Sequence, residues 1–554
     1  MPIRALGDAA LLLTVGQAVG DASLQRVVQL ARAIHEANLA AISELVPAFT
    51  TVTVHLRANA EFDRVRRDLE AIWKSLPEAA PPVEGRDLQI PVVYGGEDGP
   101  DLAAVAEYTG LEPEEVVRRH AQGRYRVHAV GFAPGFPYLA GLEKALHCPR
   151  RAEPRVEVPA GSVGIGGNQT GVYPLASPGG WQLIGRSGMT FFDATADPPT
   201  RFRIGDWVRF RPVESTEAAP TEPAGKPVVA ESLHGNAMEV LQAGLQTMVQ
   251  DLGRPGWQDQ GVPVGGAMDA HALRLANVLV GNSPDAAGLE WTLKGPRLRF
   301  LRDTVIAITG AGAKAWPVGH PISVAAGQEL DLGETVAGCR GVLAVAGGLD
   351  VPRVLGGRGT YLRASFGGFG GRVLRTGDRL PVRPSDVVGA QPGWTVFPRF
   401  LPVYSDPWVV RVVRGPQAGR FSAAAWRTLF EETFEVSPHS DRMGVRLLGR
   451  RVEPPEPSQL TSEGVAAGTI QVPANGHPIV LMADRQSLGG YPKMANVISV
   501  DLRIIAQARP RSRIRFVEVG LPEAVALREA EERDWGFFGE GVRQKLIRRK
   551  HGDD

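Results

Sequence analysis

The chain of 554 residues contains only two cysteines, Cys148 and Cys339. So few cysteines exclude a disulfide framework and a cysteine-based metal site, and they are typical of a reducing compartment. No apolar run reaches the roughly 18 residues that a membrane span needs. The N-terminus also lacks the cationic segment of a secretory signal. We therefore expect a cytoplasmic protein with no membrane partner.

The chain also lacks an excess of either charge, since 61 basic residues stand against 60 acidic ones. This balance argues against a general nucleic-acid-binding surface, although it permits a local anion site. Two short helices predicted at 101–123 resemble half of a helix-turn-helix. The second of them would present Glu114 and Glu115 to DNA phosphates, so we reject DNA binding.

Common nucleotide, metal and nucleophile motifs are missing as well. The glycine pattern at 309–315 leads into Pro317 instead of opening a helix, so we predict a turn there. The sequence has no Gly-x-x-x-x-Gly-Lys-Ser/Thr phosphate loop, no Gly-x-Ser-x-Gly elbow, and no histidines at zinc-ligand spacing. Lys493 follows Pro492 and does not fit a biotin-attachment hairpin, so we expect no biotin site in this chain.

Glycine and proline, by contrast, are abundant. The 66 glycines and 44 prolines indicate many short strands joined by tight turns. The first 85 residues differ, because helical spacing at 21–35 and 62–76 alternates with strand patterns at 9–15 and 50–56. This order predicts a small ferredoxin-like α+β domain, so the fold class is α+β and mainly β.

Changes in composition divide the chain into five parts. Residues 1–85 form the ferredoxin-like domain and residues 86–211 a strand-rich domain. A stretch rich in Pro, Ala and Glu at 212–234 reads as a linker. Residues 235–525 are strand-rich again, and 526–554 form a helical, basic tail that we expect to be solvated.

An internal repeat relates the two sides of the linker. The pattern Gly-Ser/Thr-β-x-β, then Asn, then Ser-x-Gly-Gly-aromatic occurs at 161–181 and again at 468–491. The asparagines are Asn168 and Asn475. Because such a repeat indicates related structural units, we predict that both sides contain related β modules.

Polar and aromatic residues crowd the turns of these modules. Glycine lets the backbone approach a ligand, while Arg and Asp offer contacts for anions and Mg²⁺. The candidate substrate- or nucleotide-binding residues are Phe136, Pro159, Asn168, Gln169, Thr170, Tyr173, Trp181 and Arg186 in the first half, and Gln250, Arg254, Gln258, Asp269, Gln471, Asp484, Arg485 and Gln486 in the second.

Long strings of this sequence resemble a known family. HAVGFAPGFPYLAGL at 128–142 and the segment 154–186 resemble the B subunit of 5-oxoprolinase, also called allophanate hydrolase subunit 1. The segments that resemble the C subunit, or allophanate hydrolase subunit 2, are 247–282, 288–296, 437–449 and 462–493. The two resemblances cover nearly the whole chain. The sequence departs from the usual pattern in one respect, because its linker joins two polypeptides that are ordinarily separate.

The resemblance implies a fold and a reaction. The fold is a ferredoxin-like N-terminal domain followed by cyclophilin-like β-barrels, two of which would lie within 235–525. The reaction is the opening of 5-oxoproline to L-glutamate, coupled to ATP hydrolysis and carried out with a separate A subunit. Phosphorylation of the lactam oxygen would supply a leaving group, and a transferring phosphoryl group calls for Arg, Lys and Mg²⁺.

We assign hypothetical roles on this basis. The predicted catalytic residues are His128 as acid or base, together with Arg155, Asp251, Arg442 and Lys493. Arg186 and Arg485 are further candidates for phosphate contacts. The cofactors implied are ATP and Mg²⁺, and Asp251, Asp441 and Asp484 are candidate ligands for the metal.

Two other functions stay open. The same modules resemble the carboxyltransferase domain of urea carboxylase, which would take CO₂ from carboxybiotin, although no biotin carboxylase or biotin carrier accompanies them here. Relatives are also described as a histidine-kinase inhibitor and its antagonist, which would make the chain a binding protein without catalysis. A fixed 1:1 fusion of inhibitor and antagonist would defeat such a switch. The sequence is compatible with a homo-oligomer and does not define the oligomeric state.

Overall fold

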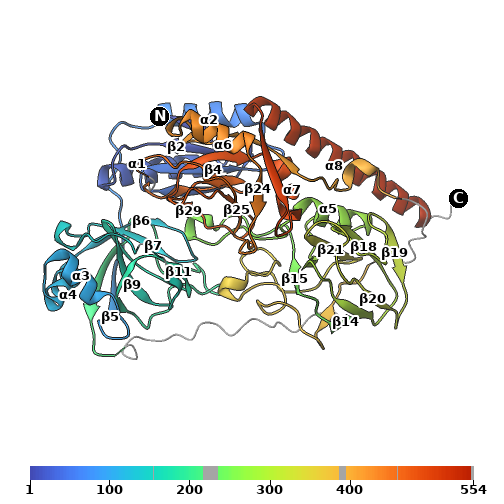
Figure 1. Cartoon of the computed structure of the whole chain (residues 1–554), viewed down its shortest axis with the longest axis horizontal. Helices are drawn as coiled ribbons and strands as arrows, with labels where there is room; N and C mark the ends of the chain where they lie inside the picture. Colours follow the sequence, from blue (N-terminus) through green and yellow to red (C-terminus); the bar gives the residue numbers. More distant parts are fainter. Residues whose placement is uncertain (152, 154, 216–234, 386–394, 458–459, 551–554) are drawn as a thin grey trace.

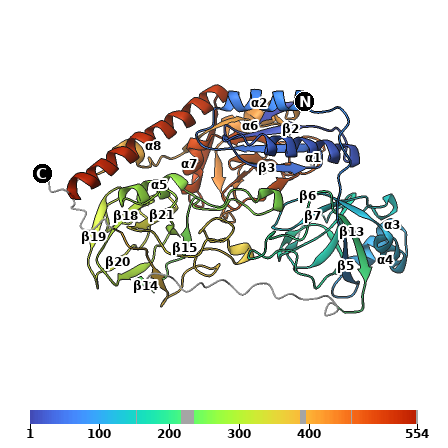
Figure 2. The ribbon, with the colours of Figure 1, turned by 180° about the vertical axis from the view of Figure 1, so that it is seen from behind.

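The structure is a computed structural model that describes all residues except 152, 154, 216–234, 386–394, 458–459 and 551–554. Figure 1 shows a lobe at each end of the molecule, formed by residues 87–212 and by residues 236–383. The N-terminal residues and a second barrel lie between and above them, and the long C-terminal helix crosses the top (Figures 1 and 2). The predicted linker lies outside the described residues from position 216 onward.

The N-terminal domain is an antiparallel sheet in the order β1-β2-β4-β3 with two helices. Its elements are β1 (Ile3–Ala5), β2 (Ala10–Thr14), α1 (Asp21–Glu36), β3 (Ile42–Ala48), β4 (Thr51–Leu56) and α2 (Phe62–Ser75). Leu24, Val27 and Leu30 are buried at helical spacing on α1. Because β4 lies between β2 and β3, these strands and α1 form the split β-α-β unit of ferredoxin-like folds, and β1 occupies the outer position.

The first barrel closes with seven strands in the order β10-β7-β6-β13-β5-β12-β9. Its strands and helices are β5 (Asp87–Tyr94), α3 (Leu102–Thr109), α4 (Pro113–Gln122), β6 (Tyr125–Val130), β7 (Pro137–Ala140), β9 (Ser162–Gly166), β10 (Gln169–Val172), β12 (Gln182–Arg186) and β13 (Trp207–Pro212). A separate two-stranded ribbon is formed by β8 (Arg155–Val158) and β11 (Ser177–Gly179). The predicted domain at 86–211 therefore matches a closed β-barrel.

The next domain corrects one expectation, because it consists of two sheets and not a closed barrel. The sheets have the orders β20-β17-β14-β22 and β15-β16-β21-β18-β19, and they share one apolar core that includes Trp291 and Leu298. The strands are β14 (Asn236–Gln242), β15 (Gln246–Gln250), β16 (Gly288–Thr292), β17 (Arg297–Phe300), β18 (Thr304–Gly310), β19 (Pro321–Val324), β20 (Glu329–Asp331), β21 (Arg340–Val345) and β22 (Arg379–Pro381). The predicted helix is present as α5 (Ala270–Leu279), which packs on β18 and β21.

The second barrel repeats the first. Its order, β23-β30-β27-β28-β25-β24-β31, has the same connectivity as the first barrel, and each barrel closes through parallel pairing of its first and last strands. The elements are β23 (Trp408–Arg414), α6 (Ala423–Glu431), β24 (Phe434–Val436), β25 (Gly444–Leu448), β27 (Thr469–Gln471), β28 (Ile479–Leu481), β30 (Lys493–Val497), α7 (Leu502–Gln507) and β31 (Arg513–Glu518), with a ribbon of β26 (Glu463–Gly464) and β29 (Leu488–Gly489). The predicted sequence repeat is confirmed, because it places β9 with β27 and β11 with β29.

The C-terminal helix α8 (Leu521–Lys550) packs on the rest of the molecule, which corrects the expectation of a solvated tail for the described part of 526–554. Leu521 and Val525 pack against the core of the N-terminal domain, and Trp535 packs against α5 and Phe400. Arg528 is buried and donates to the backbone oxygens of residues 8 and 60. The apolar positions of α8 thus join the two ends of the chain. Among the described residues, no helix combines the length and apolar character needed to cross a membrane.

Candidate functional site

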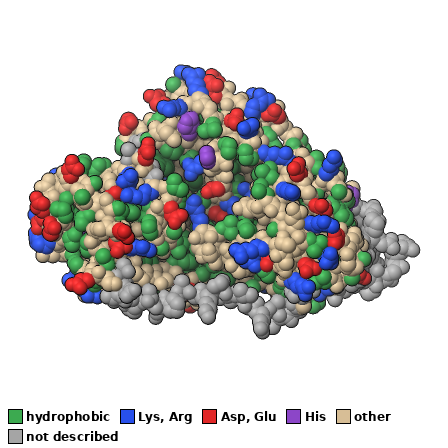
Figure 3. All heavy atoms as spheres, turned by 60° about the horizontal axis from the view of Figure 1, so that its bottom comes forward, with side chains coloured by type: hydrophobic (Ala, Val, Ile, Leu, Met, Phe, Trp, Pro, Cys, Tyr) green, Lys and Arg blue, Asp and Glu red, His purple; other side chains and the backbone are tan. Residues whose placement is uncertain are grey.

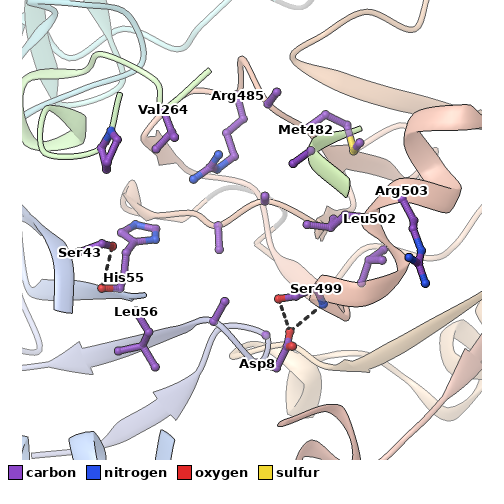
Figure 4. A pocket seen from close by; sticks show the side chains of 18 of the residues that line it. Asp8, Ser43, His55, Leu56, Val264, Met482, Arg485, Ser499, Leu502 and Arg503 are labelled. Atoms are coloured by element: carbon purple, nitrogen blue, oxygen red, sulfur yellow. Dashed lines mark hydrogen bonds between the residues drawn. The ribbon is translucent and has the colours of Figure 1, made fainter. Parts of the chain in front are cut away.

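One face of the molecule is hollowed at its centre between the lobes, with acidic and basic side chains inside the hollow (Figure 3). A cavity of about 390 Å³ lies where the two halves of the chain meet (Figure 4). The first half contributes the β1–β2 loop and parts of β3 and β4. The second half contributes the segment 255–271, loops of the second barrel, and residues of α7 and α8. Neither half encloses this cavity alone.

Arg485 is the principal cation of the cavity. It follows β28, is buried, and points into the cavity (Figure 4). Its Nη2 donates to Gln258 Oε1 at 2.9 Å, whereas its Nε has no partner and no described carboxylate forms an ion pair with it. Burial lowers the pKa of Arg485 to about 10, against a smaller opposing effect of Glu44. A buried cation without a paired anion is a candidate anion-binding group.

A residue of the first half holds the partner of Arg485 in place. Glu44 on β3 accepts hydrogen bonds from the backbone N–H groups of Gly256 (2.9 Å) and Gln258 (3.1 Å). Gln258 opens the short 3₁₀ helix η3 (Gln258–Gln260). Burial, together with Glu44, raises the pKa of the next residue, Asp259, to about 7. Contacts therefore run from Glu44 through Gln258 to Arg485, across the junction of the halves.

His55 is the second titratable group near Arg485. On β4, Val52 and Val54 face the core of the N-terminal domain, so Thr53 and His55 point to the opposite side, which the second half covers. The Nε2 atom of His55 is buried and has no hydrogen-bond partner among the described residues. Burial, assisted by Arg485, lowers the pKa of His55 to about 3, so its ring is neutral near pH 7.

A carboxylate lies on the other side of the cavity (Figure 4). Asp8 Oδ1 accepts hydrogen bonds from the backbone N–H and hydroxyl of Ser499, both at 3.0 Å. Its Oδ2 is buried and receives no hydrogen bond from the part of the chain that the structure describes, and burial raises the pKa of Asp8. At the edge of the cavity, Arg503 bonds to His271 at 2.9 Å and pairs with Glu531 at 3.2 Å.

Of the residues selected from the sequence, Gln258 and Arg485 line this cavity. Arg442 and Asp484 lie in a neighbouring buried ion cluster. Arg442 donates to Asp484 through Nε (2.8 Å) and to Glu290 Oε1 through Nη1 (2.5 Å), and its Nη2 donates to the carbonyl of Gly266. Since these bonds occupy its guanidinium, Arg442 links the second barrel to the preceding domain and offers no free edge to a phosphate.

Lys493 lies outside the cavity, in the second barrel. Its side chain is fully buried, and Nζ donates to Glu463 Oε1 at 2.8 Å. Gln417 donates to the same oxygen at 2.5 Å. On β27, the Nε2 atom of Gln471 is buried and has no partner among the residues that the structure describes. This group is a second polar site, separate from Arg485.

The candidates of the first barrel form a third group. Phe136, Tyr173 and Trp181 pack edge to face with centroids 5.2–6.4 Å apart. Arg155 donates to Asp101 at 2.8 Å. His128 is buried, its Nδ1 has no hydrogen-bond partner within the described ranges, and burial lowers its pKa to about 4. The structure does not bring these residues to the cavity.

The remaining candidates mostly support loops and strands. Thr170 bonds to Gly164 and His120, Gln250 to Thr360, Arg254 to Gly359, Arg186 to Ala160, and Asp269 caps α5 and accepts from Gln507. Pro159 and Asn168 are exposed, and Gln169 and Gln486 are half-buried. None of them lines the cavity.

The three aspartates proposed for Mg²⁺ are each engaged elsewhere. Asp251 accepts from the backbone N–H groups of residues 253 (2.8 Å) and 358 (2.5 Å), Asp441 from those of 443 and 444, and Asp484 pairs with Arg442. Within the described ranges, no group of three or more His, Cys, Asp or Glu side chains is arranged to hold a metal. Mg²⁺ therefore stays an expectation tied to ATP as a substrate.

Sequence reasoning missed Asp8, Glu44 and His55. The polar alternation along β4 was a usable signal for His55, because Thr51, Thr53 and His55 alternate with valines. No local signal distinguishes Glu44, which acts on a loop more than 200 residues away in sequence.

Comparison with known proteins identifies the class first. Residues 1–202 match the family model "Carboxyltransferase domain, subdomain C and D", and residues 260–518 match "Carboxyltransferase domain, subdomain A and B". The crystal structure of TTHA0988 superimposes with a TM-score of 0.79 at 36% identity, covering 93% of this chain and 100% of that one. The molecule is thus a two-part carboxyltransferase-domain protein.

Curated relatives specify the family further. The C subunit of 5-oxoprolinase from Escherichia coli (strain K12) is 39% identical over 53% of this chain and 96% of its own length. The B subunit of 5-oxoprolinase from Escherichia coli O157:H7 is 48% identical over 37% of this chain and 94% of its own length. The chain belongs to the family of 5-oxoprolinase B and C subunits, and it carries both in one polypeptide. A urea amidolyase of Lachancea kluyveri is 35% identical over 342 residues, which make up 18% of that protein.

Proposed function

We propose that the chain is the B–C component of an ATP-dependent 5-oxoprolinase and that it acts with a separate A subunit in the cytoplasm. One observation carries the proposal: nearly full-length counterparts of two subunits of the same enzyme are joined in one chain, and both contribute to the walls of one cavity. Binding sites commonly lie at such interfaces between domains.

The chemistry explains why ATP is needed. The lactam of 5-oxoproline is unstrained, and its nitrogen is a poor leaving group. Attack of the lactam oxygen on the γ-phosphorus of ATP releases ADP and activates the ring carbon towards water. Addition of water then expels the ring nitrogen and leaves an acyl phosphate, which a second water hydrolyses to L-glutamate and phosphate. Positioning and charge stabilisation are the main contributions that proteins make to phosphoryl transfer.

The test measures ADP and glutamate release by the purified chain with Mg-ATP. The four conditions combine the presence or absence of 5-oxoproline with that of the A subunit. We expect ADP release stimulated by 5-oxoproline and glutamate formation only when the A subunit is present. If 5-oxoproline changes neither product in any condition, the proposal is wrong.

A carboxyltransferase is the second candidate, favoured by the descriptions of the two family models and by the similarity to urea amidolyase. In this reaction, a carboxyl group would pass from carboxybiotin to an acceptor nitrogen. The chain is therefore also assayed with carboxybiotin and urea. Release of biotin that depends on urea, combined with no response to 5-oxoproline, would favour this alternative.

A further inference from the structure

Two buried arginines of the second half have opposite surroundings. Arg442 pairs with two carboxylates, Glu290 and Asp484, so its charge is compensated within the protein. Arg485 is equally buried, but the hydrogen-bond partner of its guanidinium among the described residues is the neutral side chain of Gln258. A buried charge is stable when a counter-charge or several hydrogen bonds replace its water. Of the two arginines, Arg485 is therefore the one that a bound anion would stabilise.

The end of the cavity around Arg485 has more hydrogen-bond donors than acceptors. The side-chain oxygen of Gln258 already accepts from Arg485 Nη2 at 2.9 Å. The amide nitrogen of Gln258 and the Nε atom of Arg485 are both buried and have no acceptor among the described residues. Both side chains line the cavity. A ligand with at least two acceptor oxygens would satisfy both donors.

His55 brings a third polar group to this end from the first half of the chain. Figure 4 shows His55 and Arg485 at one end of the cavity and Asp8 at the other. Burial and the nearby charge of Arg485 lower the pKa of His55, so its ring is neutral near pH 7. The buried Nε2 atom of His55, unpartnered within the described ranges, is a further donor when it carries the ring proton.

The surroundings limit the charge of a ligand at this end. Glu44 lies in the same cavity wall and acts electrostatically on Arg485. Its carboxylate would repel a second negative charge, so a singly charged carboxylate fits better than a phosphate dianion or a nucleotide triphosphate. Beyond the polar end, Leu56 and Val264 line the cavity (Figure 4). The hydrocarbon part of a small ligand would lie against this apolar surface.

We infer that the end of the cavity around Arg485 is a site for one small carboxylate, whose oxygens accept hydrogen bonds from Arg485 Nε, Gln258 Nε2 and His55. The identity of the ligand rests on the proposed function, which makes it the carboxylate of 5-oxoproline. The site lies within the polar end alone, and no contact of the same molecule with Asp8 is required. Glu44 is a positioning residue that acts through Gln258.

Calorimetric titration of the full chain, alone and with the A subunit, separates the carboxylate from the lactam. 5-Oxoprolinamide keeps the lactam ring and replaces the carboxylate with a neutral amide of similar shape. We expect 5-oxoproline to bind measurably, and both 5-oxoprolinamide and inorganic phosphate to bind about tenfold more weakly or less. Equal affinity for 5-oxoproline and its amide would overturn the site, and so would tighter binding of phosphate.

Bicarbonate distinguishes the two sources from which a singly charged carboxylate group could come. It carries the same charge and two similar oxygens but has no ring. Weaker binding of bicarbonate than of 5-oxoproline would support 5-oxoproline as the ligand. Tighter binding of bicarbonate, lost in Arg485→Met, would support the anion site and overturn 5-oxoproline as its ligand.

Two variants remove the uncompensated cation in different ways. Arg485→Met removes the charge and should weaken 5-oxoproline binding by about 10- to 100-fold. Gln258→Glu keeps Arg485 and gives it a carboxylate partner within the protein, as Arg442 already has. This variant should weaken binding by about tenfold or more without lowering the melting temperature. Arg515→Met, at an exposed arginine of β31, is the matched control and should bind like the wild type.

A third pair of variants tests the contribution of the first half. His55→Leu removes a hydrogen-bonding group and should weaken 5-oxoproline binding by about three- to tenfold. His55→Gln keeps a donor and should recover most of that loss. Wild-type affinity in His55→Leu would exclude His55 from the site. Circular dichroism establishes that each variant is folded, and Gln258→Glu tests the role of the cation even if Arg485→Met does not fold.

The outcomes separate this site from the proposed function. Unchanged affinity in folded Arg485→Met and Gln258→Glu overturns the carboxylate site even if the complex with the A subunit turns over 5-oxoproline. Binding of 5-oxoproline that depends on Arg485, without 5-oxoproline-dependent ADP release in any condition, supports the carboxylate site and overturns the proposed function. Failure of the wild type to bind 5-oxoproline or bicarbonate, with or without the A subunit, overturns the site directly.

Discussion

The two barrels share one fold but differ in what they bury. In the first barrel, Asp101 precedes α3 and forms two hydrogen bonds with the backbone of Leu183 on β12. The N–H of Leu183 donates to Asp101 Oδ2 at 2.7 Å, and the N–H of Asp101 donates to the carbonyl oxygen of Leu183 at 2.9 Å. The other oxygen of Asp101 accepts from Arg155 on the ribbon. The acidic Asp101, the basic Arg155 on the ribbon and the apolar Leu183 on β12 therefore meet at one corner of the first barrel.

The second barrel has the same backbone hydrogen bonds at the corresponding corner, but the side chains there carry different charges. The N–H of Lys493 on β30 donates to Gln417 Oε1 at 3.1 Å, and the N–H of Gln417 donates to the carbonyl oxygen of Lys493 at 3.3 Å. The side chain of Gln417 also donates to Glu463 on the ribbon. Gln417 thus corresponds to Asp101, Glu463 to Arg155, and Lys493 to Leu183. The two barrels share these backbone contacts, but a buried lysine in the second stands where the first has a buried leucine. A shared fold does not fix the chemistry of its sites.

The largest effect is expected where the second barrel joins the rest of the chain. Arg442→Met leaves Glu290 and Asp484 buried without their partner, so we expect the free energy of unfolding to fall by about 3–5 kcal/mol. Among the described residues, one contact of the first barrel with the second half is neutral, the hydrogen bond from Thr200 Oγ1 to Gln260 Oε1 at 3.0 Å. Thr200→Val should lower the free energy of unfolding by only about 0.5–1.5 kcal/mol.

Denaturant unfolding of both variants measures this difference. Equal losses of stability in Arg442→Met and Thr200→Val would contradict the distinction between an ionic and a neutral attachment.

Acid should affect the two barrels unequally. The buried histidines of the described chain, His55, His120 and His128, all lie in the first half. Burial lowers the pKa of His120 to about 3. The contribution of this neutral ring to the free energy of unfolding is therefore fully present above about pH 6.5. It is lost as the pH falls towards 3, because only the unfolded chain takes up the proton in this range. We expect His120 alone to lower the free energy of unfolding by about 3 kcal/mol between pH 7 and pH 4.

Hydrogen exchange at pH 7 and pH 4 separates the barrels. Peptides from 87–212 should lose more protection than peptides from 408–518, and His120→Gln should flatten the pH dependence. Equal loss of protection in both barrels, unchanged by His120→Gln, would refute this assignment.

Exchanging the barrel-specific residue has a smaller effect. Lys493→Leu copies the residue of the first barrel and leaves Glu463 without its ammonium partner, so we expect a loss of about 1–3 kcal/mol in the free energy of unfolding. Gln417→Asp and Glu463→Arg, added to Lys493→Leu, reproduce the corner of the first barrel and should recover most of that loss. Failure of the triple variant to exceed the single variant in stability would show that the two corners are not equivalent.

The smallest effect concerns the contact between the halves. Glu44→Gln keeps an acceptor for Gly256 and Gln258 but removes a negative charge near Arg485. We expect KM for 5-oxoproline to change by about three- to tenfold while kcat and the melting temperature change little. Equal changes in KM and kcat would contradict a role limited to positioning Arg485.

Much of the fold follows from local sequence patterns. The apolar spacing of α1 and α2, the Pro-initiated α4, and the repeated motif of β9 and β27 are sufficient to predict two related β modules after an α+β domain. Strand β3 was not predicted, since Pro47 interrupts its pattern. The sheet pairing of residues 236–383 depends on long-range contacts, which is why two sheets replaced the expected barrel there.

The candidate site was less predictable. Gln258 and Arg485 belong to distinctive turn segments, whereas Glu44 and His55 lie in ordinary strands. Packing of the two halves alone brings these residues together. The same packing engages the guanidinium of Arg442 in bonds within the protein. The sequence does not predict this ion pair, because the partner Glu290 lies 152 residues away in the chain.

Glutamate production in the presence of ATP, 5-oxoproline and the A subunit is the most direct test of the central claim, that both halves form one 5-oxoproline site. The wild type, Arg485→Met from the second half, His55→Leu from the first half and the control Arg515→Met are compared. The account predicts full activity in the wild type and the control, and a raised KM for 5-oxoproline in the other two. Wild-type kinetics in both cavity variants, or no glutamate from the wild type, would contradict it.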